Sequence, residues 1–258
     1  CKPMHLDLSD LVILITGASR GIGRACARAC ADAGATVAVH YAHSDDAAQD
    51  VAAACGNDAQ PFRADLTDRA ATDRLLSDVV ATYGRLDVLV NNAGVAVAAP
   101  LDAPTDAWHD AWSRTMHVNL RAPEVLSRHA IRHFTADNGS AGRLIHIASR
   151  AAFRGDTPDY MTYAASKAGL VALSKSIARG FGDAGITSFV VAPGFTRTDM
   201  AQDFIDAYGE EYATSDLALD RLTEPEDVAP LVVFLASGHA AHATGTSIDV
   251  NAGSYVRP

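Results

Sequence analysis

Short runs of consecutive apolar residues alternate along the chain with longer segments in which apolar residues recur every three or four positions. Residues 11–16 form the clearest run, which is typical of a strand buried on both faces of a parallel sheet. Further strands are expected at residues 35–39, 61–64, 86–90, 144–148, 186–191 and 247–250. Helices are expected up to about residue 33 and over residues 44–55, 68–83, 105–134, 159–182 and 225–235. This alternation predicts an α/β fold: a single doubly wound parallel sheet (Rossmann fold) of about seven strands with helices on both faces.

Some segments have features of their own. The helix at 159–182 is expected to bury a stripe of apolar residues at helical spacing, namely Leu170, Leu173, Ile177 and Phe181. Pro123 is expected to bend the helix at 105–134. Residues 198–222 are polar and acidic, which predicts a mobile lid. No linker or change of composition divides the chain, so we expect one domain over residues 1–258.

Composition limits the classes of function. The chain has 258 residues, of which 48% are apolar, and its formal net charge is −10. A large apolar fraction supports a full core, and the negative charge argues against nucleic acid and anionic membrane surfaces as partners. No apolar run is long enough to cross a membrane and none forms a leader, so we expect a soluble, cytoplasmic protein. The cysteines have no metal-binding spacing, and Cys26 and Cys30 on one helix are expected to be core residues.

A glycine-rich turn, residues 17–23, follows the first strand and opens the first helix. Glycine permits a tight turn and close approach of the backbone to a pyrophosphate, while the helix N-terminus offers unpaired N–H groups. The turn therefore predicts a dinucleotide site, although a plain strand–helix turn is the simpler alternative. The turn residues expected to contact the cofactor are Gly17, Ser19, Arg20, Gly21, Ile22 and Gly23.

The end of the second strand indicates which dinucleotide is bound. A cofactor without a 2′-phosphate is usually held there by a carboxylate, but residues 40–44 contain none. Arg20 lies inside the glycine turn and is placed to meet a 2′-phosphate, unless it is an exposed surface charge. We therefore favour NADP(H) over NAD(H).

Tyr163 and Lys167 are the clearest candidates for acid–base chemistry. They are four residues apart on a predicted helix, so they share one face. An ammonium beside a phenol favours the phenolate, so we expect Lys167 to lower the pKa of Tyr163 toward neutrality. A phenol tuned in this way is a usable general acid or base. Ser149 ends the strand before this helix, where open α/β sheets bind ligands. The alternative is an ordinary amphipathic pair, because the spacing alone is weakly specific.

Six motifs, in order, resemble those of the short-chain dehydrogenase/reductase family. They are the glycine turn, Asp65-Leu66, the run from Asn91 through Ala93 to Gly94, Asn119, the set of Ser149, Tyr163 and Lys167, and the segment with Pro193, Gly194, Thr196 and Thr198. The resemblance implies that Tyr163 protonates the carbonyl oxygen, Ser149 orients that oxygen, Lys167 binds the nicotinamide ribose and Asn119 holds a water for proton supply. It implies that the remaining motif residues, together with Tyr163 and Lys167, bind the cofactor, and that no metal is needed.

Each motif residue also has a simpler explanation. Asn119 could satisfy backbone groups in a long helix, and Ser149 could be a turn residue at a strand end. Thr198 could be only an N-cap, and Asp65 could cap the helix that begins near residue 68. The spacing departs from the family pattern in one place: 14 residues separate Ser149 and Tyr163, one more than is expected in many relatives. We place the extra residue in the loop around 156–158.

The substrate is less well defined. Within the family, the motifs resemble 3-oxoacyl-acyl-carrier-protein reductases, but two loops where such relatives carry basic residues read Asp183-Ala184 and 137–141 without a base. The lid is acidic, and an acidic protein repels an acidic carrier protein. We therefore expect a small-molecule ketone or alcohol as substrate, with carrier-protein reduction as an alternative and a catalytically silent sensor or scaffold as another. The resemblance also implies a homotetramer, paired through the two long helices and the C-terminal segment.

Overall fold

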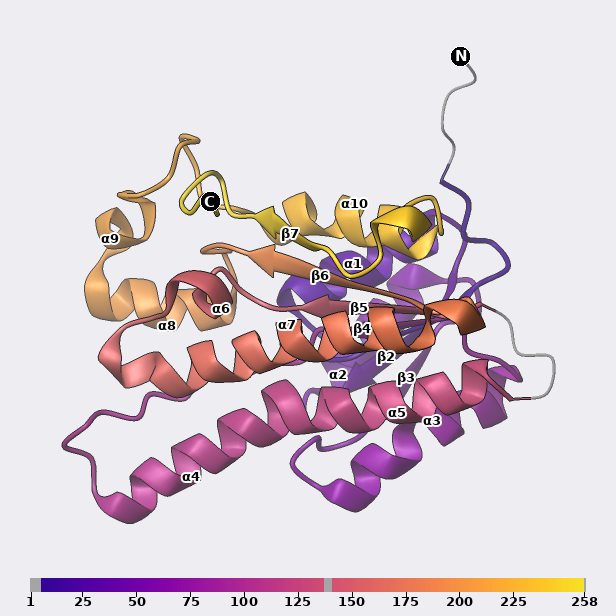
Figure 1. Ribbon diagram of the computed structural model, residues 1–258, viewed down its shortest axis with the longest axis horizontal. Coiled ribbons are helices and arrows are strands. Elements are labelled where there is room, and N and C mark those ends of the chain that lie inside the picture. Colours follow the sequence, from indigo (N-terminus) through magenta and orange to yellow (C-terminus); the bar gives the residue numbers. More distant parts are fainter. Residues whose placement is uncertain (1–5, 137–140, 258) are drawn as a thin grey trace.

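Seven parallel strands form one sheet in the order β3-β2-β1-β4-β5-β6-β7. The structure, a computed structural model, describes residues 6–136 and 141–257 (Figure 1). The strands are β1 (Val12–Ile15), β2 (Thr36–Tyr41), β3 (Gln60–Arg63), β4 (Val88–Asn91), β5 (Arg143–Ile147), β6 (Thr187–Pro193) and β7 (Ser247–Val250). The predicted fold class is confirmed. Because β1 lies between β2 and β4, the winding reverses beside β1, and such a reversal opens a crevice at the carboxyl ends of the strands.

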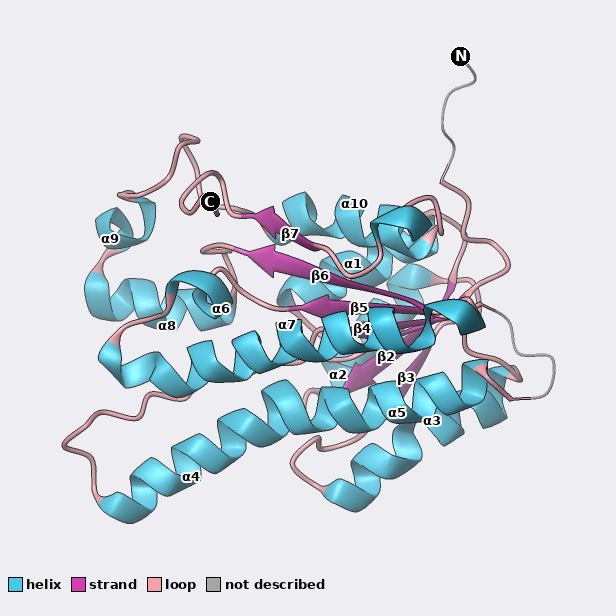
Figure 2. Ribbon diagram, in the orientation of Figure 1, coloured by secondary structure: helices cyan, strands magenta, loops and turns pink. Residues whose placement is uncertain are grey.

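Helices cover both faces of the sheet (Figure 2). They are α1 (Gly21–Asp32), α2 (Asp45–Cys55), α3 (Arg69–Tyr83), α4 (Thr105–Met116), α5 (Ala122–Phe134), α6 (Ala151–Arg154), α7 (Met161–Phe181), α8 (Asp199–Tyr208), α9 (Glu210–Thr214) and α10 (Pro225–Ala236). One core cluster joins the sheet to α1, α2 and α10, and a second joins it to α3, α5 and α7. Helices α6, α8 and α9 lie beyond the carboxyl ends of β5 and β6 (Figure 1).

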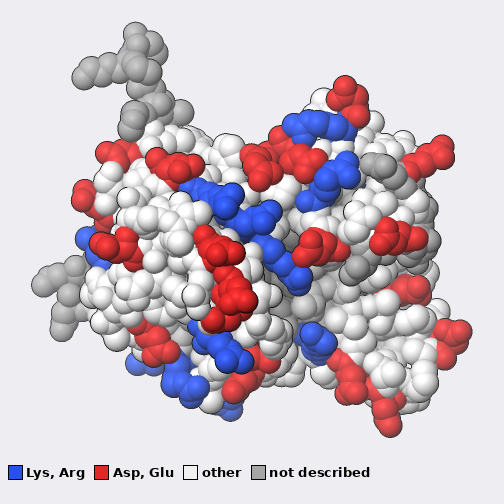
Figure 3. Space-filling view, turned by 180° about the vertical axis from the view of Figure 1, so that it is seen from behind, with Lys and Arg blue, Asp and Glu red and all other residues white. Residues whose placement is uncertain are grey.

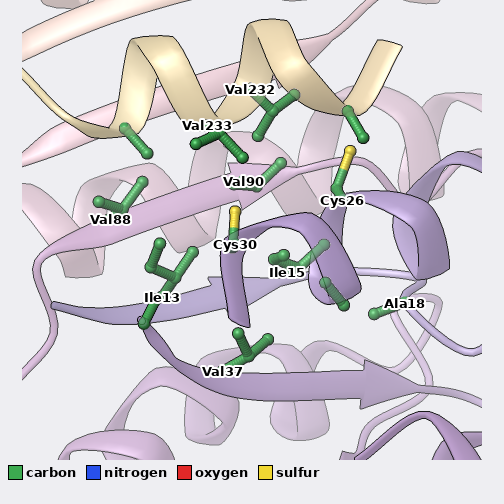
Figure 4. Close-up of a cluster of buried hydrophobic side chains, with 14 of the residues drawn as sticks. Ile13, Ile15, Ala18, Cys26, Cys30, Val37, Val88, Val90, Val232 and Val233 are labelled. Carbon is green, nitrogen blue, oxygen red and sulfur yellow. The ribbon is translucent and has the colours of Figure 1, made fainter. Parts of the chain in front are cut away.

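The first of these clusters places the cysteines in the core, as expected. Cys26 and Cys30 of α1 are fully buried free thiols between the sheet and α10 (Figure 4). Val232 and Val233 of α10 belong to the same cluster, with Val90 of β4. Small side chains on α1 therefore let α10 pack closely against it. Burial raises the pKa of the Cys30 thiol to about 12, so this thiol is inert at neutral pH.

The segment expected as one long helix, 105–134, contains a turn of π-helix. Residues 117–121 form this turn between α4 and α5, and Asn119 lies in it, fully buried. Pro123 follows in the first turn of α5 and has no N–H to donate there. A π-helical turn inside a helix often marks a functional position.

Other expectations need correction or lie outside the described residues. Leu170 and Ile177 are buried, but Phe181 at the end of α7 is 38% exposed, so the buried stripe stops before it. The polar segment 198–222, expected to form a lid, contains two helices, α8 and α9. Residues 137–140, where a docking loop was considered, lie outside the part that the structure describes.

His40, near the end of β2, holds the glycine turn in place by a hydrogen bond. Its Nδ1 accepts a hydrogen bond from the backbone N–H of Gly17 at 3.0 Å, and its Nε2 lies 3.0 Å from the carbonyl oxygen of Ala64. These contacts require a neutral ring protonated at Nε2. The ring is 1% exposed, and burial lowers the pKa of His40 to about 4. The sequence motifs did not indicate this role.

We expect the His40→Gln variant to flatten the pH dependence of stability. An unfolded chain protonates His40 near pH 6.5, whereas the folded chain resists protonation down to about pH 4. The unfolded state therefore binds more protons in this window, and stability falls as the pH drops through it. From pH 7 to pH 5, His40 should remove about 2 kcal/mol from the free energy of unfolding. Glutamine keeps a donor and an acceptor but does not titrate.

Urea unfolding of both proteins at the two pH values measures this difference. The wild type should lose about 2 kcal/mol more than His40→Gln on acidification. His146, whose pKa burial lowers to about 3, acts equally in both proteins and cancels. Equal losses in the two proteins would show that His40 is not held neutral by the fold.

Candidate active site

A cleft of about 490 Å³ opens at the carboxyl ends of the strands. Its first wall is the glycine turn after β1. Gly17 has φ of +65°, which favours glycine, and a Cβ on Gly23 would lie 2.3 Å from the carbonyl oxygen of Gly17. The turn therefore needs glycine at both positions, and it leaves backbone N–H groups of the α1 N-terminus facing the cleft. This cradle fits a pyrophosphate.

The end of β4 forms the floor beside this turn. Asn92 Nδ2 donates to the carbonyl oxygens of Thr16 at 2.8 Å and Gly17 at 3.2 Å. In return, the Thr16 hydroxyl accepts the backbone N–H groups of Asn92 at 2.9 Å and Ala93 at 3.0 Å. These bonds join the ends of β1 and β4 directly. They fix the two strand ends between which the crevice opens.

Asn91, expected to contact the cofactor, does not line the cleft. Its side chain is buried and its Nδ2 lies 3.3 Å from the hydroxyl of Ser127 and 3.2 Å from Nδ1 of His146. Alternation along a strand sends neighbouring side chains to opposite sides, so Asn92 faces the cleft and Asn91 faces the core. The sequence motif contained both residues and did not distinguish them.

Arg20 projects over the mouth of the cleft. Its guanidinium forms an ion pair with Asp199, the first residue of α8, at 3.0 Å, and both side chains are largely exposed. Arg20 is thus available to a ligand but already has a competing carboxylate. The guanidinium of Arg20 therefore lies beside the N-terminus of α8, at the edge of the cleft.

Tyr163 and Lys167 lie on α7 and face the cleft from the other side. Lys167 is 3% exposed, its Nζ donates to the carbonyl oxygen of Ile147 at 2.9 Å and lies 5.8 Å from the centroid of the Tyr163 ring. Ser149 stands at the end of β5, and its hydroxyl hydrogen-bonds Tyr163. Ser149 also accepts the N–H of Ala151 at 3.1 Å. The structure therefore brings these three predicted residues together.

The expectation that Lys167 lowers the pKa of Tyr163 is wrong for this arrangement. Burial raises the pKa of Tyr163 to about 12, and the nearby charge of Asp156 adds to the rise. The hydrogen bond from Ser149 acts in the opposite direction. Burial also lowers the pKa of Lys167 to about 8. The phenol is thus protonated at neutral pH, as a proton donor must be.

Asn119 is close to this group but does not line the cleft. Its Oδ1 accepts the N–H of Val95 at 2.8 Å, and its Nδ2 donates to the carbonyl oxygen of Val95 at 2.8 Å and to the hydroxyl of Ser166 at 3.0 Å. A Cβ on Gly94 would lie 3.2 Å from Lys167 Nζ and 3.4 Å from Asn119 Oδ1. The amide therefore satisfies backbone groups, as the simpler explanation held, and also ties the segment after β4 to α7.

Two further simple explanations are partly right. Thr198 is the N-cap of α8 and accepts the N–H of Ala201 at 3.4 Å, while still lining the cleft. Asp65 does not cap α3: Asp68 does, and Asp65 instead bonds the N–H and hydroxyl of Thr67. These bonds hold the pKa of Asp65 below its usual range, so it is a carboxylate in the wall of the cleft.

Most of the predicted residues share the cleft. The lining contains Gly17, Ser19, Arg20, Gly21, Ile22, Gly23, Asp65, Leu66, Ala93, Gly94, Ser149, Tyr163, Lys167, Pro193, Gly194, Thr196 and Thr198. Sequence reasoning missed other lining residues with polar or aromatic side chains, among them Asn92, Arg150, Arg154, Asp156, Tyr160, Phe195 and Phe204. The extra residue between Ser149 and Tyr163 was the one indication of the charged members of this set.

Residues 6–136 and 141–257 hold neither a metal-binding cluster nor a membrane-spanning helix. In that part of the chain, no group of three or more His, Cys, Asp or Glu side chains is placed to hold a metal ion. Over the same described residues, none of the helices combines the length and apolar character needed to cross a membrane.

Comparisons with known proteins agree with this geometry. A family model described as enoyl-(acyl carrier protein) reductase matches residues 17–255. An L-rhamnose 1-dehydrogenase (NAD(P)(+)) of a Sphingomonas strain is 37% identical, over 96% of this chain and 98% of its own length. A 3-oxoacyl-[acyl-carrier-protein] reductase of Haemophilus influenzae is 36% identical, over 95% of this chain and 98% of its own.

Solved structures show the same likeness. A dehydrogenase/reductase of Sinorhizobium meliloti superposes with a TM-score of 0.90 at 37% identity, covering 98% of each chain. A short-chain dehydrogenase of Burkholderia cenocepacia in complex with NADP has a TM-score of 0.88 at 36% identity, covering 97% of this chain and 99% of its own. The chain belongs to the short-chain dehydrogenase/reductase family of NAD(P)-dependent oxidoreductases.

Proposed function

We propose that the protein is an NADP(H)-dependent oxidoreductase that interconverts a small ketone and its alcohol, with Tyr163 as the proton donor and acceptor. One observation carries this proposal: Ser149, Tyr163 and Lys167 meet in the cleft that the glycine turn opens. When bound, the nicotinamide cofactor supplies the hydride. The residues of the chain supply position, a proton and electrostatic stabilisation.

Each side chain has a separate task in this proposal. Tyr163, protonated at neutral pH, donates its proton to the carbonyl oxygen, and Ser149 holds that oxygen by a hydrogen bond. Lys167, buried beside them, would donate hydrogen bonds to the nicotinamide ribose, and the hydroxyl of Ser149 stabilises the phenolate left on Tyr163. Asn119 keeps the segment after β4 against α7, so that Gly94 and Lys167 hold their spacing. The glycine turn, Asp65, Leu66, Ala93, Pro193, Gly194, Thr196 and Thr198 hold the cofactor.

The proposed reaction is tested on a panel of small diketones, ketoesters and hydroxyketones. We expect the protein to oxidise NADPH only when a ketone is present and to form the alcohol in equal amount. Transfer of deuterium from C4-labelled NADPH to the carbinol carbon would identify the hydride as the transferred group. A protein that binds NADPH but reduces none of the panel would contradict the proposal.

NADP(H) is proposed over NAD(H) because Arg20 is a cation at the cofactor end and residues 40–44 offer no carboxylate. A 2′-phosphate would replace Asp199 as the partner of Arg20. We expect wild type to bind NADPH more tightly than NADH, and Arg20→Ala to lose about tenfold in NADPH affinity while NADH affinity changes little.

Equilibrium fluorescence titration of both cofactors measures these affinities. Asp199→Asn is the matched control, because it removes the competing charge and should strengthen NADPH binding. Tighter binding of NADH by wild type, or NADPH affinity unaltered in Arg20→Ala, would contradict the assignment.

Carrier-protein thioesters are the second candidate substrate, supported by the 3-oxoacyl-[acyl-carrier-protein] reductases among the relatives. The described surface disfavours an acidic partner. Asp183 and Ala184 are exposed where a docking base was sought, and Arg121 in the π-helical turn is paired with Glu124, while Arg128 and Arg132 on α5 are exposed. Figure 3 shows the opposite face from α4, α5 and α7, and there Lys and Arg along the middle have Asp and Glu on both sides. We therefore propose a small-molecule substrate.

The remaining expectations are kept as proposals. The domain spans the chain, and 198–222 moves as a lid, whose ion pairs to the rest of the chain include Arg20–Asp199 and Arg150–Asp216. Hydrogen exchange should be faster in α8 and α9 than in α7 and should slow when NADPH binds.

A homotetramer, paired through α4, α5, α7 and the C-terminal segment, is supported by exposed Trp112 and Phe181 on these helices. Light scattering should give four times the chain mass of 27.0 kDa.

Free buried thiols suit a reducing, cytoplasmic location, which cell fractionation tests.

A further inference from the structure

We propose that Arg154, the last residue of α6, and Asp156, on the loop between α6 and α7, bind hydroxyl groups of the substrate, so that the preferred substrate is a small polyhydroxylated ketone or alcohol. The inference rests on the proposed function, and it names the substrate class and the residues that select it. Its observation is a pair of opposite charges on the substrate wall of the cleft, beside Tyr163.

The loop follows α6, the short helix that begins shortly after Ser149. Helix α6 begins two positions beyond Ser149 and ends at Arg154, and the next residue, Gly155, has φ of +80° in the left-handed region. Arg154 and Asp156 flank that glycine, and both line the cleft together with Tyr160 and Tyr163.

The two charges act on each other: burial raises the pKa of Asp156, and the nearby charge of Arg154 acts against this rise. Among the residues that the structure describes, Arg154 has no ion pair or side-chain hydrogen bond, and Asp156 accepts one bond, from the N–H of Thr157 at 2.8 Å. Arg150, the neighbouring cation, is by contrast 5% exposed and paired with Asp216 at 2.8 Å. Arg154 therefore has donors, and Asp156 has acceptor capacity, for groups in the cleft.

The balance of charge indicates which groups these are. A carboxylate on the substrate would be attracted by Arg154 but repelled by Asp156. An ammonium group would be attracted by Asp156 but repelled by Arg154. A hydroxyl suits both, because it donates to a carboxylate and accepts from a guanidinium in charge-assisted hydrogen bonds. Two neighbouring hydroxyls can use both side chains at once.

Aromatic residues of the cleft suit the carbon skeleton of such a molecule. Tyr160, Phe195 and Phe204 line the cleft, with ring centroids 6.0 Å apart for Tyr160 and Phe204 and 5.1 Å for Phe195 and Phe204. Aromatic faces pack against C–H groups while the charged pair binds the hydroxyls. A ketone without hydroxyls would form none of the charge-assisted hydrogen bonds to Arg154 and Asp156.

The loop is also held in place. Phe153 on α6 packs under the guanidinium of Arg257, whose carbon lies 4.4 Å from the ring centroid, and Arg257 is paired with Asp249 of β7 at 2.7 Å. Arg257, near the C-terminus, thus holds α6 next to β7. A fixed loop presents its two charges without the entropic cost of ordering them on binding.

The test compares two ketones of nearly equal shape, 2-hydroxycyclohexanone and 2-methylcyclohexanone, in wild type, Arg154→Ala and Asp156→Ala. We expect wild type to prefer the hydroxylated ketone in kcat/KM by about tenfold or more, and each variant to reduce that preference to about twofold. The ratio of the two substrates cancels any change in the pKa of Tyr163 that removal of Asp156 causes. Arg74→Ala and Asp78→Ala, at exposed positions of α3, are the matched controls and should keep the wild-type ratio.

Other outcomes overturn the inference in distinguishable ways. Equal kcat/KM for the two ketones in wild type would contradict it while leaving ketone reduction intact. Preference for pyruvate over the uncharged butanone, lost in Arg154→Ala, would show that Arg154 binds an anion and would also overturn it. A ratio unchanged in both variants would remove these residues from substrate selection. Failure to reduce any ketone, with NADPH bound, would contradict the proposed function itself.

Discussion

The junction between the ends of β1 and β4 is the constraint on which the rest of the site depends. Asn92 and Thr16 exchange four hydrogen bonds with the backbone across it, one of them to Gly17. His40 supports the same glycine from β2. Parallel strands end together at one edge of the sheet, and this junction determines how far apart two of those ends stand. The cradle for a pyrophosphate and the segment through Gly94 both follow from it.

The chemistry depends on burial at the neighbouring strand end. Burying Lys167 lowers its pKa to about 8, so its charge is kept at neutral pH with little reserve, and burying Tyr163 keeps the phenol protonated. A buried ammonium is costly unless it has hydrogen-bond acceptors, and the carbonyl oxygen of Ile147 is one acceptor for Lys167. Burial thus sets the two protonation states that donation of a proton to a carbonyl oxygen requires.

The sequence predicted the sheet, the glycine turn and the meeting of Ser149, Tyr163 and Lys167, because each depends on local spacing or on strand ends that parallel sheets bring together. It did not separate Asn91 from Asn92, since one residue of register decides which side chain faces the cleft. It gave the pKa of Tyr163 the wrong direction, because the effect of a neighbouring charge is visible in sequence and the cost of burial is not. Arg154 and Asp156 were hidden for a related reason: the spacing between Ser149 and Tyr163 does not show which side chains of the intervening segment face the cleft.

The central claim is that Tyr163 delivers the proton during carbonyl reduction, and the rate of hydride transfer in Tyr163→Phe tests it most directly. Phenylalanine keeps the ring and removes the hydroxyl. Stopped-flow oxidation of bound NADPH in a single turnover, with any ketone that the wild type reduces, measures the chemical step apart from product release. The account predicts an NADPH affinity within about twofold of wild type and a rate lower by about a hundredfold or more. A variant that transferred hydride at a tenth of the wild-type rate or faster would contradict it.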